Sequence, residues 1–258
     1  MRKIYRSSER NVTYRSPFHQ IIITIIIKKM GFTFPYRVKI LEKNYLNHNV
    51  IQFLIQKPYG YSHRAGQAIE LSIDKPGFEL AIAPFTITNL NNDSYLELIV
   101  KINVEKGSLT HGLSTMAIGE TLQITEAWDS YQYKGRGIFI AAGTGITPFL
   151  PILKELKAEG EDIPKEHTLL YANKTSADIL FNAHLKKVFG NNCIYILSRS
   201  KSRNSIFGRI NIDILKRYVH DFNQFFYICG PRHFETDITK QLVSMGVQRA
   251  RIQTGYKF

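Results

Sequence analysis

The sequence is poor in cysteine. Only Cys193 and Cys229 occur among 258 residues, too few for a disulfide framework, a tetrahedral cysteine zinc site or the four thiolates of an iron–sulfur cluster. We therefore expect no metal site, and any redox centre in this chain must be a bound organic cofactor. The lack of a disulfide framework also predicts a cytoplasmic protein, because thiols stay reduced in that compartment.

A long hydrophobic run is also missing. The apolar stretch at residues 21–27 is interrupted by Thr24, whereas about 20 apolar residues are needed to span a bilayer. No small-residue cleavage site follows it, so a signal peptide is not predicted either. We interpret residues 1–33 as an N-terminal extension that is disordered or loosely attached, with peripheral membrane contact as the alternative.

Acidic residues are scarce relative to basic ones. The chain has 34 Lys and Arg against 21 Asp and Glu, which gives a formal net charge of +13. A surplus of positive charge suits an acidic protein partner, whose docking it would accelerate. Zinc-finger spacing, a basic leucine zipper and an RNP-type aromatic motif do not occur, so nucleic acid is not the expected partner.

A glycine-rich turn stands between a predicted strand and a predicted helix. Residues 137–142 are apolar, residues 143–148 read Gly-Thr-Gly-Ile-Thr-Pro, and residues 149–156 carry apolar side chains at helical spacing. Thr147 is a natural N-cap and Pro148 a natural first helical residue. The start of such a helix attracts a phosphate, and glycine leaves room for a pyrophosphate to approach the backbone.

A second motif follows another predicted strand. Residues 224–228 are apolar and aromatic, and Cys229, Gly230 and Pro231 then interrupt the run before a helix that carries Ile238. The carboxyl ends of parallel strands are where open α/β folds bind their ligands. Together, the two motifs predict a nicotinamide nucleotide site.

The pattern of elements predicts a β barrel followed by an α/β domain. From residue 135 onward strands alternate with helices, which is typical of a parallel sheet. We therefore expect a barrel domain over residues 34–134 and a nucleotide-binding domain over residues 135–258. The six strands predicted for an antiparallel barrel are 36–41, 50–55, 67–73, 85–88, 95–102 and 121–125, with a short helix at 109–117. The five strands predicted for the parallel sheet are 138–142, 168–172, 193–197, 225–228 and 251–253.

These motifs, in this order over about residues 34–258, resemble the ferredoxin-NADP reductase superfamily, and most closely the stand-alone flavodoxin reductase-like proteins of bacteria. Those proteins carry a G-x-G-x-T-P loop under the nucleotide pyrophosphate, a C-G-P segment beside the nicotinamide and an R-x-[YF]-[ST] motif on a flavin-binding barrel. The last motif is present here as Ala83-Pro84-Phe85-Thr86, without its arginine. A lysine-containing strand and a G-x-x-[ST] turn match Val100-Lys101 and residues 107–110.

The resemblance implies a role for each matching residue. Phe85 would pack against the flavin ring, Thr86 would place a hydroxyl near the flavin N5, and Cys229 would border the nicotinamide without acting as a nucleophile. Thr86 and Cys229 are thus the implied catalytic residues. The implied flavin-binding residues are Phe85, Thr86, Ile87, Thr88, Lys101, Gly107, Ser108, Leu109, Thr110 and the terminal aromatic Phe258. The implied nucleotide-binding residues are Gly143, Thr144, Gly145, Thr147, Pro148, Ser198, Arg199, Arg209, Cys229, Gly230 and Pro231.

One departure from the family pattern and one agreement with it bear on the cofactors. Alanine at position 83 offers no donor to the flavin pyrophosphate, so Lys101, Lys106 or Arg64 would have to substitute for the missing arginine. FAD is the flavin that the resemblance implies, with FMN as the alternative. The basic stretch at residues 198–203 and Arg209 suit a 2′-phosphate, which favours NADPH over NADH.

The implied activity is that of a flavin-dependent NAD(P)H oxidoreductase. Electrons would pass from NADPH through FAD to an acidic acceptor protein such as flavodoxin or ferredoxin. Alternatives are the reductase component of an oxygenase or a flavin/quinone reductase. Because Ala83 replaces the arginine, a degenerate nucleotide-binding module without catalytic activity is a further alternative.

Overall fold

The computed structural model describes Ile26, residues 31–78 and residues 80–255. The chain divides after Thr33, and the unit Phe34–Phe258 contains all the elements described below. Most of the predicted N-terminal extension, with its possible membrane contact, lies outside the described residues, as does Phe258. Among the described helices, none has the length and apolarity that crossing a membrane requires.

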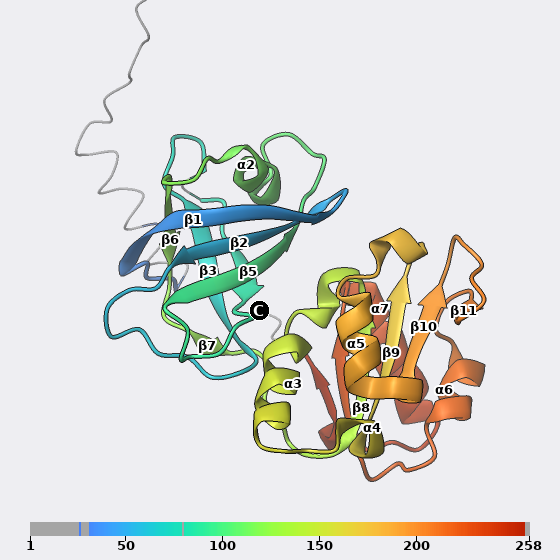
Figure 1. Cartoon of the computed structure of the whole chain (residues 1–258). Coiled ribbons are helices and arrows are strands. Elements are labelled where there is room, and N and C mark those ends of the chain that lie inside the picture. Colours follow the sequence, from blue (N-terminus) through green and yellow to red (C-terminus); the bar gives the residue numbers. More distant parts are fainter. Residues whose placement is uncertain (1–25, 27–30, 79, 256–258) are drawn as a thin grey trace, which may run out of the picture. The chain divides into compact units, whose positions relative to one another are not determined.

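The first half of the second unit is an antiparallel, barrel-like sheet (Figure 1). Its strand order is β4-β3-β6-β1-β2-β5, and β7 pairs with β3 beside this path. The two ends of the order are linked by an isolated bridge between Ile87 and Leu98 and by a hydrogen bond from Thr88 N to Glu97 O at 2.9 Å. The strands are β1 (Tyr36–Asn47), β2 (Val50–Gln56), β3 (Gln67–Ile73), β4 (Ala83–Thr86), β5 (Tyr95–Lys101), β6 (Thr121–Ile124) and β7 (Trp128–Asp129), and the helix α2 spans Leu109–Thr115.

Strand β3 shows how this sheet divides its side chains between two faces. Because successive side chains on a strand point to opposite sides, Ile69 and Leu71 enter the apolar core of the barrel, whereas Ala68 and Glu70 point the other way. Both sets are buried. The outer face of β3 is therefore covered by other residues, and this face bears on the site described below.

The second half is a parallel sheet of six strands in the order β11-β10-β9-β8-β12-β13. The order reverses direction between β8 and β12, since β8 has β9 on one side and β12 on the other. The strands are β8 (Gly137–Ala142), β9 (His167–Asn173), β10 (Cys193–Leu197), β11 (Ser205–Phe207), β12 (Phe225–Cys229) and β13 (Ile252–Thr254). The α-helices are α3 (Phe149–Ala158), α4 (Ile163–Glu166), α5 (Asn182–Phe189), α6 (Ile212–Tyr218) and α7 (Arg232–Ser244), and the 3-10 helices are η1 (Gly143–Ile146), η2 (Ser176–Asp178), η3 (Gly190–Asn192) and η4 (Arg249–Arg251).

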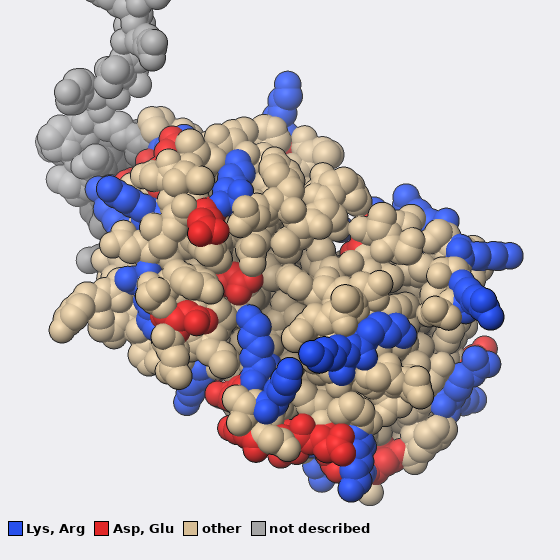
Figure 2. Space-filling view, viewed as in Figure 1, with Lys and Arg blue, Asp and Glu red and all other residues tan. Residues whose placement is uncertain are grey.

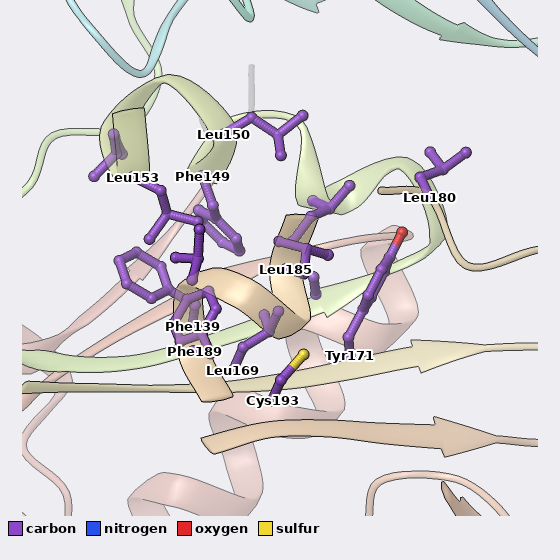
Figure 3. Close-up of a cluster of buried hydrophobic side chains, with 14 of the residues drawn as sticks. Phe139, Phe149, Leu150, Leu153, Leu169, Tyr171, Leu180, Leu185, Phe189 and Cys193 are labelled. Atoms are coloured by element: carbon purple, nitrogen blue, oxygen red, sulfur yellow. The ribbon is translucent and has the colours of Figure 1, made fainter. Parts of the chain in front are cut away.

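Both faces of the parallel sheet are covered by helices. Phe139 of β8 packs with Phe149 of α3 and Phe189 of α5 in the apolar cluster that Figure 3 shows. Ile140, the next residue along β8, joins a second cluster with Leu242 of α7 on the opposite face. Burial on both faces explains why these strands read as continuous apolar runs in the sequence.

The predicted order of an antiparallel barrel followed by a parallel sheet is confirmed. The predicted bounds of β3 and β10 agree with the structure, whereas β1 extends to Asn47, six residues beyond its predicted end. The parallel sheet has six strands instead of the predicted five, because the short β11 forms after the basic loop. The two-residue β7 was also missed.

Candidate functional site

The two sequence motifs meet at the point where the order of the parallel strands reverses. Ala141 of β8 lies opposite Cys229 of β12, so the turns after these strands leave the sheet side by side. A Cβ atom on Gly145 would lie 2.1 Å from the carbonyl oxygen of Cys229. Glycine at position 145 is therefore required by the close approach of the two motifs, a reason that differs from the room for a pyrophosphate predicted from the sequence.

The turn after β8 is tighter than the sequence suggested. Gly143 has a φ of +56°, which favours glycine, and the chain then forms the 3-10 helix η1. The predicted N-cap role of Thr147 is wrong, because the backbone is already helical there and Pro148 precedes the first residue of α3. The Thr147 hydroxyl donates instead to the Thr144 carbonyl at 2.9 Å. A further donor, the hydroxyl of Tyr171, holds the Gly143 carbonyl at 2.9 Å.

A cavity of about 470 Å³, here called the central cavity, brings the barrel motif and the C-G-P motif together. Thr86 from β4 and Cys229 from β12 both line it. Its volume is within the range typical of sites for small organic ligands. Its walls are formed by Ala68, Pro84, Phe85, Thr86, Ile99, Lys101, Trp128, Ser130, Tyr131, Ala142, Thr144, Gly145, Thr147, Cys229, Gly230, Pro231 and Gly255.

The Cys229 thiol is held in its neutral form. Burial raises its pKa to about 12, against a smaller lowering effect of the hydrogen bond with Tyr131. Tyr131 is itself 2% exposed, and its hydroxyl donates to the Ile228 carbonyl at 2.6 Å. A thiol with so high a pKa is not a thiolate nucleophile at neutral pH, which agrees with a Cys229 that packs against a ligand or positions it.

A second cavity of about 300 Å³, here called the edge cavity, lies at the carboxyl ends of the parallel strands. Asn173, at the end of β9, is 8% exposed, and both polar atoms of its side chain lack a hydrogen-bond partner among the described residues. Such buried groups are normally satisfied, so a ligand with polar groups fits this cavity. Lys174 and Arg209 add two cations to the same wall.

The two cavities share one boundary. Lys101, Ala142, Thr144 and Pro231 line both of them. Lys101 is the last residue of β5. Among the described residues of the barrel-like sheet, it is the one Lys or Arg that lines both cavities. A ligand that occupied both cavities and carried a negative charge in its middle would thus have that charge neutralised by Lys101.

The predicted site residues divide into three groups. The central cavity is lined by Phe85, Thr86, Lys101, Thr144, Gly145, Thr147, Cys229, Gly230 and Pro231, and the edge cavity by Lys101, Gly143, Thr144, Ser198, Arg209 and Pro231. Neither cavity is lined by Ile87, Thr88, Gly107, Ser108, Leu109, Thr110, Pro148 or Arg199. Phe258 lies outside the described residues.

Several residues of the third group have local structural roles. The Thr88 hydroxyl donates to Glu97 O at 3.1 Å, and its side chain is fully buried. The Ser108 hydroxyl is the N-cap of α2, and the Thr110 hydroxyl accepts a hydrogen bond from Asn103 N at 3.0 Å. The hydroxyls of these three residues, for which the resemblance implies flavin binding, thus each have a partner within the chain.

The structure also narrows the choice of a substitute for the missing arginine. The Arg64 guanidinium binds both carboxylate oxygens of Asp129, at 2.8 and 3.0 Å, and lines neither cavity. Lys106 lines neither cavity either, whereas Lys101 lines both. Of the three candidates, Lys101 is therefore the best placed to meet a pyrophosphate.

Sequence reasoning missed much of the wall of the central cavity. Ala68, Trp128, Ser130 and Tyr131 were not predicted as site residues, although all of them line it. Trp128 is the only tryptophan of the chain. Its position follows from the pairing of β7 with β3, which no local motif reveals.

Comparison with known families identifies both halves of the chain. Residues 35–133 match the model of an FAD-binding domain, and residues 139–240 match that of an oxidoreductase NAD-binding domain. The match to an FAD-binding domain confirms the expectation of FAD. The residues in hand fit this cofactor, since the central cavity combines apolar walls with the hydroxyl of Thr86 and the ammonium group of Lys101.

Curated relatives include reductases that use NADH. NADH-cytochrome b5 reductase 1 of Bos taurus is 26% identical over 185 residues, which cover 59% of this chain and 60% of that protein. NADH-cytochrome b5 reductase 2 of Danio rerio is 26% identical, with 84% of this chain and 83% of that protein covered. The chain thus spans about 60% of the length of the first of these relatives.

Solved structures share the fold. The flavohem-like FAD/NAD-binding domain of nitric oxide dioxygenase from Vibrio cholerae superposes with a TM-score of 0.74 at 20% identity and covers 86% of this chain and 98% of that one. A ferredoxin NADP⁺ reductase from Neisseria gonorrhoeae, with bound FAD and NADP, superposes with a TM-score of 0.70 at 19% identity. The match covers 85% of this chain and 97% of that one.

Proposed function

Because this chain belongs to the ferredoxin-NADP reductase superfamily, we propose that it transfers electrons from a reduced nicotinamide nucleotide through FAD to a separate acceptor. The observation that carries the proposal is the meeting of Thr86 and Cys229 on one cavity. When bound, FAD supplies the ability to take up a hydride and to release electrons singly. The protein needs only to position the reactants and to exclude water.

Each wall of the central cavity has a part in this positioning. Phe85 and Thr86 lie on the barrel side, where the hydroxyl of Thr86 would hydrogen-bond to the flavin. Cys229 and Gly230 lie on the opposite side, where the neutral thiol of Cys229 would border a flat ring. Lys101 lies at the boundary between the two cavities, where its ammonium group would neutralise the pyrophosphate of FAD in place of the missing arginine.

The edge cavity supports a choice of nucleotide. Arg209 and Lys174 provide two cations that suit the 2′-phosphate of NADPH. The names of the curated relatives point to NADH instead. We propose NADPH as the preferred donor and NADH as a usable one, with Arg209 responsible for the difference.

The acceptor follows from the relatives and from surface charge. The relatives are named for reduction of cytochrome b5, which favours a small haem protein of this type over the flavodoxin or ferredoxin predicted from the sequence. Figure 2 shows Lys and Arg side chains scattered over the visible face, with Asp and Glu side chains between some of them, and the chain as a whole has a net charge of +13. Such a surface supports docking of an acidic electron-transfer protein.

The test uses the full chain, reconstituted with FAD or FMN. We expect FAD to bind, and its visible absorbance to bleach when NADPH is added without oxygen. Reoxidation is then followed with cytochrome b5, flavodoxin, ferredoxin and oxygen as separate acceptors. A protein that binds neither flavin would contradict the proposal, and reoxidation by oxygen alone would contradict the protein acceptor.

A variant of Thr86 sharpens this test. Thr86→Val keeps the shape of the side chain but removes the hydroxyl, and loss of one hydrogen bond at the reacting ring should slow flavin reduction about tenfold. Thr168→Val is the matched control, since Thr168 lies on β9 and lines neither cavity. Equal rates of flavin reduction in the two variants would remove Thr86 from the reaction.

A further inference from the structure

Three strands of the antiparallel sheet present a continuous row of side chains to the central cavity. Ala68 of β3 lies opposite Thr86 on one side and opposite Trp128 on the other. Residues directly opposite each other in antiparallel strands point to the same face. All three line the central cavity, so the row Thr86–Ala68–Trp128 is part of its wall.

The dimensions of this row suit a flat tricyclic ring. Neighbouring strands lie about 4.8 Å apart, so Thr86 and Trp128 are separated by about 10 Å across the sheet. Ala68, the residue between them, has only a methyl group as its side chain. A ring whose one edge reaches Thr86 would therefore extend over Ala68 toward the indole of Trp128.

Trp128 is fixed in place by the residue that follows it. The carboxylate of Asp129 accepts hydrogen bonds from Arg64, Gln67 and Gln132, each with a contact of 2.8 Å. Asp129 is also opposite Gln67 in the ladder between β3 and β7. A strand of two residues is thereby held firmly enough to present a large side chain at a defined position.

The position of Trp128 is not that of an ordinary core residue. It belongs to none of the three clusters of buried hydrophobic residues found in the described part of the chain. Its side chain lines the cavity instead. It shares a sheet face with Thr86, whereas the C-G-P motif approaches from β12 of the other sheet. A ligand that reached Thr86 on this face would therefore be the one that meets Trp128.

Resting on the proposed function, we propose that Trp128 is a flavin-contact residue whose indole packs against the isoalloxazine ring of bound FAD and contributes to both its affinity and its emission. Aromatic pairs gain free energy beyond the burial of their surface. An indole in contact with a flavin also quenches the flavin's fluorescence. The indole donates an electron to the excited flavin, and the electron then returns to the indole, so no net reaction takes place.

The experiment compares apoprotein titrated with FAD for the wild type and three variants. Trp128→Phe keeps an aromatic ring, Trp128→Leu removes it, and Phe207→Leu changes an aromatic residue that is 55% exposed and lines neither cavity. The dissociation constant of FAD, the emission of bound FAD and the position of its visible bands are measured. Circular dichroism and thermal unfolding report whether each variant is folded.

We expect bound FAD to emit more strongly in both Trp128 variants than in the wild type. Trp128→Leu should bind FAD roughly fivefold more weakly, while Trp128→Phe stays within about twofold of the wild type. Phe207→Leu should match the wild type in both measurements. These results would support a contact between Trp128 and the flavin even if Trp128→Leu were less stable, because the stronger emission is also measured in Trp128→Phe, which keeps an aromatic ring.

The inference and the proposed function fail in different ways. Wild-type protein that binds no FAD would overturn both. Wild-type protein that binds FAD, with unchanged emission and bands in Trp128→Phe and unchanged affinity in Trp128→Leu, would overturn the role of Trp128 alone. Lower thermal stability in these variants, with no change in the bound flavin, would likewise mean that Trp128 has only a structural role.

Discussion

The two sheets of this molecule place residues on the central cavity by different geometric rules. In the parallel sheet all strands point the same way, so the residues that follow β8 and β12 arrive at one edge together. In the antiparallel sheet the contributing residues lie on a face, in the row Thr86–Ala68–Trp128, and are brought together by strand register. An edge site is thus built from turns, and a face site from cross-strand neighbours.

This difference has a consequence for substitutions. At the edge of the parallel sheet the backbone of one turn touches the backbone of the next, so a single added atom displaces both. On the face of the antiparallel sheet, side chains meet side chains and the effects are graded. The following predictions test this contrast, beginning with the largest expected effect.

Gly145→Ala should have the largest effect. Its Cβ would lie 2.1 Å from the carbonyl oxygen of Cys229 and 2.9 Å from the nitrogen of Gly230, both of which are backbone atoms. Neither can move without displacing the end of β12, so we expect a loss of about 3 kcal/mol or more in the free energy of unfolding. Chemical denaturation measures this loss, and nucleotide titration should show weaker binding.

Gly143→Ala provides the matched control in the same turn. There the nearest atom to an added Cβ is the flexible end of Lys101, at 4.0 Å, and the cost is that of a left-handed φ of +56° alone. This cost should be about 1 kcal/mol. Equal losses in the two variants would mean that backbone contact between the turns is not what requires glycine at position 145.

Glu70 should make the antiparallel sheet sensitive to pH. It is 3% exposed on the outer face of β3, one of its carboxyl oxygens has no hydrogen-bond partner among the described residues, and burial raises its pKa to about 7. The folded state therefore holds a proton that the unfolded state, with a pKa of 4.5, releases. Stability should fall by about 3 kcal/mol as the pH rises from 4 to 8, because the folded state must then bury a charge or bind a proton.

The Glu70→Gln variant isolates this contribution. It cannot ionise, so its free energy of unfolding should change less between pH 4 and 8 and should exceed that of the wild type at pH 8. Glu105→Gln, at an exposed position, should leave the pH dependence unchanged. A Glu70→Gln profile that runs parallel to the wild type would show that Glu70 is ionised in the folded protein.

The contrast between edge and face also explains what the sequence could predict. The turns after β8 and β12 are local, so the G-x-G-x-T-P and C-G-P motifs located the edge of the site without any knowledge of pairing. Strands β3 and β10 were predicted with their true bounds because they are buried and rich in apolar residues. The order of the domains and the family followed from these local patterns.

The remainder depends on contacts between distant residues. Trp128 lies on a strand of two residues and β11 has three, too few for any periodicity to show. Beyond Leu41, β1 continues through polar and exposed residues whose register shifts twice against β2. Thr147 looked like an N-cap because a preceding 3-10 turn leaves no mark in the residue pattern. These features are set by tertiary contacts, which local propensity does not contain.

Arg209→Ala tests the edge cavity, and its expected effect is smaller than those of Gly145→Ala and of the change in pH. If Arg209 binds the 2′-phosphate, its removal should weaken NADPH binding about tenfold and leave NADH binding nearly unchanged. Arg203→Ala is the matched control, because Arg203 is exposed and lines neither cavity. Affinities for both nucleotides are measured with the FAD-loaded protein. Equal weakening for NADPH and NADH would assign Arg209 to a part that the two nucleotides share.

Tyr131→Phe should have the smallest effect, and it tests whether the face and the edge are coupled. Tyr131 follows β7, yet its hydroxyl donates to the Ile228 carbonyl near the end of β12 at 2.6 Å. The variant loses this buried hydrogen bond together with the one to the Cys229 thiol, and the free energy of unfolding should fall by about 1 kcal/mol. Tyr133→Phe is the control, since within the described part of the chain the Tyr133 hydroxyl hydrogen-bonds to His167 Nε2, at 3.2 Å, and not to β12.

The informative measurement is the rate of flavin reduction at saturating nucleotide. Because the Tyr131 hydroxyl holds the strand that ends in Cys229, its loss should slow flavin reduction while Tyr133→Phe does not. A lower stability in Tyr131→Phe with an unchanged rate would mean that the end of β12 keeps its position without this bond. The face and the edge would then be independent parts of the site, each positioned by its own sheet.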